Sequence, residues 1–137
     1  MKVNYSNHPK MVYVPKNWGH ELWISNSEKY CGKRLFMAKG CSLSLHFHLL
    51  KEESFFVERG KLKVFYHDDH KMVQEYLDKH GKDVMYSVLD FVVLEEGDNF
   101  HVPPGLVHQM IALKETVFFE FSTQHFDEDS HRILKGD

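Results

Sequence analysis

The chain has 137 residues, of which 42% are hydrophobic, 27% charged and 14% aromatic, and its formal net charge is −3. These values fit one globular domain over residues 1–137 and exclude the basic patches of nucleic-acid-binding proteins. The N-terminal sequence MKVNYSNHPKMVYVPKN lacks the apolar segment of a signal peptide, and no stretch of the chain is long enough to cross a bilayer. We therefore expect a cytoplasmic protein with neither a membrane nor a nucleic acid as its partner.

Short runs of alternating apolar and polar residues dominate the chain, and turn-type residues separate many of them. They start with KMVYVP, HELWI and KRLFMA between about residues 10 and 38, continue with SLSLHFH, SFFVE and KLKVFYH, and end with VMYSVLDFVVLEE, NFHVP, LVHQMIAL and TVFFEFS. Many short strands at this spacing, with little helical periodicity, predict an all-β sandwich or barrel.

Two segments interrupt this strand pattern. The first, at about residues 67–88, begins with the polar sequence HDDHKMVQEYLDKHGK and resembles an insertion, for which we expect a hairpin tip or one helical turn. The second is the charged tail at about residues 124–137, which we expect to be peripheral.

The run LSLHFH carries two histidines in an otherwise apolar strand. Because side chains alternate along a strand, His46 and His48 lie on the same face, separated by two residues or roughly 7 Å. Two imidazoles at that separation can reach one metal ion, and Glu53 follows at the start of the next predicted strand. The other face, with Leu43, Leu45 and Phe47, needs an apolar cover, either from the N-terminal strands or from a second subunit.

These residues belong to two longer motifs. The first reads Gly40-CSLSL-His46-Phe-His48-LLKE-Glu53-SFFVER-Gly60, and the second reads Gly97-DNFHV-Pro103-Pro104-Gly105-LV-His108. In order and spacing they resemble the two motifs of the cupin family, at residues 40–60 and 97–112. Ala112 stands where that family often has asparagine.

The resemblance implies an all-β cupin jelly-roll barrel with a metal site inside it. The implied ligands are His46, His48, Glu53 and His108. Imidazole and carboxylate ligands suit Zn, Mn, Ni or Fe, and such an ion would act chiefly as a Lewis acid.

A closer likeness concerns the reaction. The stretch EKYCGKRLFMAKGCSLSLHFHLLKEESFFVERGKLKV, with Trp18-Gly19 before it, resembles the C-terminal cupin domain of type II mannose-6-phosphate isomerases. The chain departs from that family at Lys51, where arginine is usual, and in its longer segment between the two motifs. The likeness implies a metal-dependent isomerase that interconverts aldose and ketose forms of a sugar or sugar phosphate through an enediol.

Under this hypothesis, other residues would bind the substrate and move the proton. Lys33, Arg34 and Arg132 are the candidate cations for a phosphate, although neighbours on one strand cannot both face inward. Glu52 and His101 are the candidate bases, because His101 shares the strand face of Pro103 and is expected to point at the cavity.

Three alternatives remain open at this point. The same ligands could serve an Fe-dependent oxygenase, or the protein could be a sugar-binding cupin without catalytic activity. A metal-free epimerase or ketoisomerase of nucleotide-linked sugars would use His46 and His48 as acid and base. In each case the partner is a small molecule, and we expect a homodimer.

Overall fold

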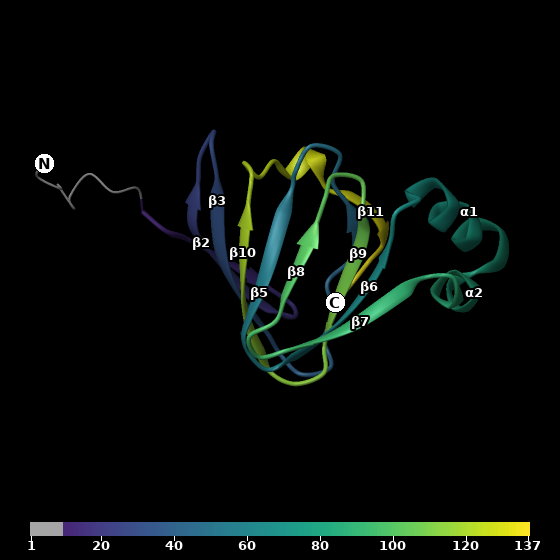
Figure 1. Cartoon of the computed structure of the whole chain (residues 1–137), viewed down its shortest axis with the longest axis horizontal. Coiled ribbons are helices and arrows are strands. Elements are labelled where there is room, and N and C mark those ends of the chain that lie inside the picture. The colour runs from purple at the N-terminus through teal and green to yellow at the C-terminus, as the bar shows by residue number, and fades with distance from the viewer. Residues whose placement is uncertain (1–9) are drawn as a thin grey trace, which may run out of the picture.

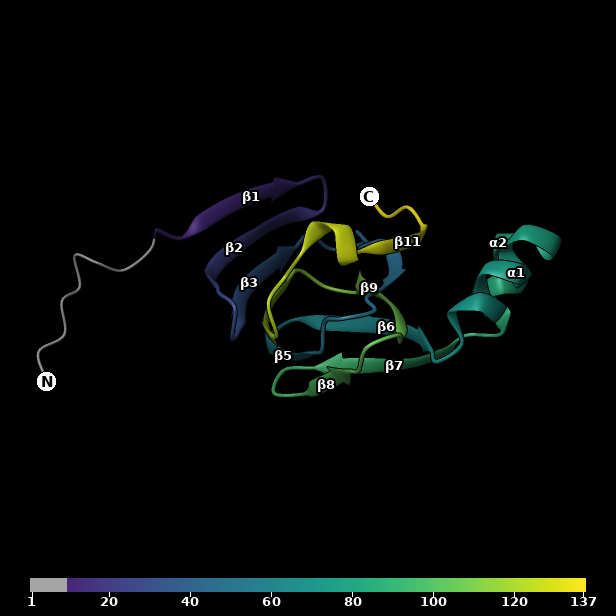
Figure 2. The same cartoon turned by 90° about the horizontal axis from the view of Figure 1, so that it is seen from above.

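The chain folds as two antiparallel β-sheets that face each other (Figures 1 and 2). The computed structural model describes residues 10–137, so the first nine residues of the predicted domain lie outside the described part. The six-stranded sheet has the order β1 (Val12–Lys16), β2 (Gly19–Asn26), β3 (Cys31–Met37), β10 (Thr116–Ser122), β5 (Glu53–Arg59) and β8 (Asn99–Val102). The five-stranded sheet has the order β11 (His131–Leu134), β4 (Leu45–Phe47), β9 (Val107–Ala112), β6 (Lys61–His67) and β7 (Asp90–Glu95). The predicted all-β architecture is confirmed.

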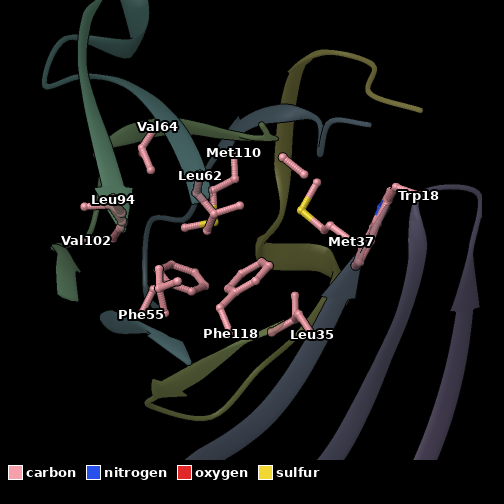
Figure 3. Packing of buried hydrophobic residues seen from close by; sticks show 12 residues of the cluster. Trp18, Leu35, Met37, Phe55, Leu62, Val64, Leu94, Val102, Met110 and Phe118 are labelled. Carbon is pink, nitrogen blue, oxygen red and sulfur yellow. The ribbon is translucent and has the colours of Figure 1, made fainter. Parts of the chain in front are cut away.

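The core lies between the sheets and follows the alternation of the strands. In β5, Phe55 and Val57 point inward and are almost fully buried. They meet Phe118 from β10 and Leu62 and Met110 from the facing sheet (Figure 3). Each such side chain contributes about 1.5–3 kcal/mol when it leaves water, so this packing holds the two sheets together.

Two helices occupy the segment for which we expected a hairpin tip or one helical turn. Helices α1 (His70–His80) and α2 (Lys82–Ser87) lie between β6 and β7 and project from the side of the barrel (Figure 1). Asp69 caps α1 by accepting a hydrogen bond from the backbone N–H of Met72 at 3.0 Å, and Lys79 and His80 in the last turn suit the negative end of the helix dipole. Within residues 10–137, no helix is long and apolar enough to cross a membrane.

The helices provide the apolar cover that the outer face of β4 needs. Val73 from α1 and Met85 from α2 are fully buried in a cluster that includes Leu45 and Val107. Phe47 packs at the edge of the same cluster. Our expectation that the N-terminal strands or a second subunit cover this face is therefore wrong for Leu45 and Phe47.

The C-terminal segment is part of the sheet rather than peripheral. Strand β11 pairs with β4, and Arg132 lies opposite His46 in the register. A short 3-10 turn, Asp127–Asp129, precedes it and buries the side chain of Asp129. Because this tail is rich in charged residues, the sequence did not suggest a strand. In the structure β11 is the edge strand of the five-stranded sheet, next to the strand that carries His46.

Candidate metal centre

Three histidines meet on the inner face of the five-stranded sheet. His46 and His48 lie on β4 and at its end, and His108 lies on β9 directly opposite His46. The ring centroids are 4.5 Å apart for His46 and His108 and 4.9 Å apart for His46 and His48. One ring nitrogen from each of the three lies within 4.8 Å of the others, which is close enough to share a metal ion.

Backbone carbonyls fix the orientation of all three rings. Each Nδ1 lies within hydrogen-bond distance of one carbonyl oxygen: Ser44 for His46 at 2.9 Å, Asp129 for His48 at 3.1 Å and Leu106 for His108 at 3.0 Å. Because Nδ1–H donates to these oxygens, the proton-free Nε2 atoms are left as ligand atoms.

Glu53 completes the set from the facing sheet. Its Oε2 atom lies 3.1 Å from Nε2 of His108 and 3.5 Å from Nε2 of His48. Among the described residues, this buried oxygen accepts no hydrogen bond. Lone pairs of nitrogen and oxygen thus converge on one point, which is costly unless a cation occupies it.

Burial also keeps these groups in the form that binds a metal. Burial lowers the pKa of His46 well below its usual value and lowers the pKa of His48 to about 4. Burial opposes ionisation of Glu53, but His108 and Lys51 beside it hold the pKa of its carboxyl below the usual value. At neutral pH His46 and His48 are therefore neutral and Glu53 is a carboxylate, which suits a divalent ion such as Zn, Mn, Ni or Fe.

A buried charge cluster stands behind Glu53. The ammonium of Lys51 lies 3.3 Å from Oε1 of Glu53, 2.7 Å from Oε2 of Glu120 and 3.0 Å from Nδ1 of His125. Burial opposes the charge of Lys51, but Glu120 and Glu53 raise its pKa. Burial and the nearby Glu53 raise the pKa of Glu120.

Our reading of the sequence missed this cluster, although strand alternation contains its signal. Lys51 is two residues before Glu53, so alternation predicts the same side for both. Glu120 is two residues after Phe118 and shares the inward face of β10 with it. A charged residue on the inward face of an apolar strand indicates either a buried ion pair or a site.

Asp129 holds the loop that joins β4 to β5. Its carboxylate accepts hydrogen bonds from the backbone N–H groups of Leu49, Leu50 and Lys51 at 2.9–3.2 Å. Its carbonyl oxygen is the one that orients His48. One residue of the C-terminal segment thus positions both a candidate ligand and the loop that leads to Glu53.

The candidate metal ligands line a cavity of about 570 Å³. The wall away from the histidines contains Glu21, Trp23 and Lys33 from β2 and β3. His125, Arg132 and the end of the chain line the remaining side. A cavity of this volume has room for a small polar molecule in contact with a bound ion.

The structure separates the three predicted cations. Lys33 is 3% exposed and lines the cavity, whereas its neighbour Arg34 is exposed on the outer face, as strand alternation requires. Arg132 also lines the cavity. Two of the three residues therefore lie where they could contact a substrate.

The two predicted bases lie elsewhere. Glu52 and His101 form a pair at 2.7 Å whose side chains are 55% and 53% exposed, and neither lines the cavity. His101 does share its strand face with Pro103, but both are exposed and it is Val102 that points inward. The expectation that His101 faces the cavity is wrong. His101 does lie on the same side of β8 as Pro103, but that side is the outer face.

Comparison with known families agrees with the fold and the motifs. The family model described as Cupin matches residues 20–133, so the chain belongs to the cupin family and the predicted jelly-roll fold is confirmed. A comparison with curated proteins finds no matching sequence.

Solved structures of the same fold support this assignment. Similar chains include the capsular polysaccharide assembling protein CapF from Staphylococcus aureus, with a TM-score of 0.69 and 14% identity over 93% of this chain and 33% of that one. KdgF from Halomonas sp. has a TM-score of 0.59 and 14% identity over 80% of this chain and 81% of that one. A single-residue variant of the oxalate decarboxylase from Bacillus subtilis has a TM-score of 0.68 and 17% identity over 95% of this chain and 31% of that one.

The chain thus spans about a third of the length of the CapF and oxalate decarboxylase chains. For the Bacillus subtilis oxalate decarboxylase, Mn(II) centres are described. At these identities the likeness establishes the fold, and the chemistry must be argued from the residues of this chain.

Proposed function

We propose that this cupin is a metal-dependent isomerase that interconverts the aldose and ketose forms of a sugar or sugar phosphate. The observation that carries the proposal is the orphaned oxygen of Glu53, which faces two imidazole nitrogens at the floor of a polar cavity. The naming of CapF as a capsular polysaccharide assembling protein lends support to a carbohydrate ligand.

In this proposal His46, His48, His108 and Glu53 hold one divalent ion. When bound, the ion supplies Lewis-acid chemistry that polarises carbonyl and hydroxyl oxygens of the substrate. The protein orients the substrate through the cavity wall, where Lys33 and Arg132 offer cationic groups.

A proton must also move between two carbon atoms of the substrate. Glu52 and His101 do not line the cavity, so the group that carries this proton is sought among those that do. Glu21 and His125 are half-buried there, and both have a titratable group in contact with the cavity.

The test combines metal analysis with isotope exchange. We expect the purified protein to hold one transition metal ion per chain and to incorporate deuterium at C1 or C2 of an aldose or ketose phosphate, measured by NMR. His46→Ala should lose both the ion and at least about 100-fold of the exchange rate, because a ligand is removed. His80→Ala, which removes an exposed imidazole from α1, should change neither.

Other results would contradict the proposal. Full exchange by the metal-free protein would favour a metal-independent epimerase, and oxygen consumption with Fe(II) would favour an oxygenase. A tightly bound ion without exchange on any sugar phosphate would leave a sugar-binding protein. The homodimer stays a prediction, which sedimentation in solution would test.

A further inference from the structure

The segment after β11, residues 135–137, borders the opening of the cavity. Lys135 and Asp137 line the cavity but are exposed, as is Lys16 at the end of β1, whereas the candidate metal ligands lie deeper. Figures 1 and 2 both place the C end of the chain beside the turn between β1 and β2. Lys16 on one side and residues 135–137 on the other therefore define the mouth of the cavity.

This segment is attached to the sheet through a single residue, Ser42. The backbone N–H of Asp137 donates to the carbonyl oxygen of Ser42 at 3.0 Å, and the carboxylate of Asp137 accepts hydrogen bonds from the backbone N–H and the hydroxyl of Ser42. Within residues 10–137, every hydrogen bond of the segment goes to Ser42. The side-chain bonds lie at the surface, where water competes for the same groups, so they are easily exchanged for bonds to water.

Between these contacts, Gly136 approaches the backbone of the sheet very closely. A methyl group on its Cα would lie 2.4 Å from the carbonyl carbon of Leu43 and 2.6 Å from the carbonyl oxygen of Ser42. Gly136 is not among the glycines with a positive φ, so its backbone conformation is open to any residue. It is the missing side chain that allows the segment to lie against the sheet.

The sheet at this point cannot move to accommodate a side chain. The N–H of Leu43 donates to the carbonyl oxygen of Met110 at 2.9 Å, and its carbonyl oxygen accepts from Nε2 of Gln109 at 2.9 Å. The hydroxyl of Tyr86 donates to Oε1 of Gln109 at 2.7 Å and holds that amide in place. A side chain at Gly136 would therefore displace the segment and not the strand.

We propose that residues 135–137 form a strap that opens and closes the mouth of the cavity, and that Gly136 is the residue that lets the strap close. The strap thereby controls which molecules reach the candidate metal ligands and how fast they do so. The proposal concerns access to the cavity and does not depend on the isomerase reaction.

Fluorescence quenching measures this access directly. Trp18 and Trp23 are the only tryptophans of the chain, and both line the cavity, so quenching by acrylamide reports the entry of a small polar molecule. In the metal-free protein, Gly136→Ala and Asp137→Ala should raise the quenching constant about 2-fold or more, because the open state of the strap becomes more populated. Gly32→Ala is the matched control: its methyl group meets nothing within 4 Å, so quenching should equal that of the wild type.

A control for stability accompanies the quenching measurement. All variants are measured well below their melting temperatures, which circular dichroism provides. Val73→Ala lowers the stability of the helix cluster, away from the mouth, and should leave quenching unchanged.

Release of bound zinc to a chelator tests passage in the other direction. A strap that only controls access changes uptake and release by the same factor. Asp137→Ala should therefore speed both, measured by stopped flow with a chelating dye, and leave the zinc Kd unchanged.

Wild-type quenching in folded Gly136→Ala and Asp137→Ala would overturn the proposal. Increased quenching in Val73→Ala would overturn it too, because loss of stability would then be enough to expose the tryptophans. Faster zinc release without faster uptake would show that the segment positions the ligands and does not control access. Because quenching is measured on the metal-free protein, a lack of bound metal or of isotope exchange would refute the proposed function and leave the strap intact.

Discussion

Two sides of the cavity are built in different ways: the floor, which carries the candidate metal ligands His46, His48, His108 and Glu53, and the wall, which carries Lys33. On the floor, each candidate ligand has a second contact that fixes it: a backbone carbonyl for each imidazole and Lys51 for Glu53. On the wall, Lys33 has its nearest carboxylate at 3.6 Å and an aromatic ring as its other neighbour. The candidate ligands are thus fixed in one geometry by their second contacts, whereas Lys33 is held more loosely.

The sharpest test of this contrast is Lys51→Met. Without the ammonium, Glu53 and Glu120 become buried carboxylates that lack their cation, so we expect the free energy of unfolding of the metal-free protein to fall by about 3–5 kcal/mol. Urea denaturation followed by circular dichroism measures the change.

Lys33→Met is the matched control for that variant. It replaces a lysine that is equally buried, but Glu21 beside it is half-buried and keeps Trp23 as a donor, so the expected loss is only about 1 kcal/mol. Equal losses for the two variants would show that floor and wall do not differ in the way described.

Mild acid should lower the stability of the metal-free protein through the buried histidines of the floor. In the unfolded chain His48 takes up a proton below pH 6.5, but in the folded metal-free chain burial delays this to about pH 4, and the pKa of His46 is lowered as well. Unfolding therefore takes up protons between these values, so the free energy of unfolding should fall as the pH drops from 6.5 towards 4, by on the order of 1–3 kcal/mol. Thermal melts across this range measure the slope. His48→Gln should flatten it, and a melting temperature independent of pH in the wild type would contradict the buried, neutral state of these histidines.

A further test concerns Asp129, which supports the loop behind the candidate metal ligands. Asp129→Asn removes the negative charge that accepts three backbone N–H groups, which should cost about 1–2 kcal/mol of stability and weaken zinc binding about 10-fold. Competition with a chelating dye measures the affinity. Glu128→Gln, an exposed change in the same turn, should have no effect. Unaltered zinc affinity in Asp129→Asn would mean that the loop needs no such anchor.

The floor could be predicted from the sequence because its residues are fixed by spacing. Strand alternation places His46 and His48 on one face, and the resemblance to the cupin motifs implies Glu53 and His108 as their partners. The two-sheet fold follows from the alternation of the short runs. Alternation also predicts that Lys33 and Arg34 point to opposite faces, as they do.

The remaining features depend on contacts between segments that are distant in the chain. The pairing of Lys51 with Glu120 joins residues from distant parts of the sequence, and no local pattern connects them. The choice between the inner and outer face of β8 depends on its register with β5, where Val102 lies opposite Glu53. Helix α1 did carry an amphipathic signal that the polar composition of the segment masked: Val73, Tyr76 and Leu77, at i, i+3 and i+4, pack in one cluster.

The placement of the two helices has a consequence for how a barrel of this kind can change over time. The helical segment joins the ends of β6 and β7, which pair with each other up to Tyr66 and Asp90. The segment could therefore be gained or lost without disturbing the pairing of these two strands. Yet Leu45 and Val107, which the helices cover, alternate along their strands with candidate ligands. A lineage that discarded the helices would have to replace those apolar residues with polar ones, within one position of the histidines that it must keep.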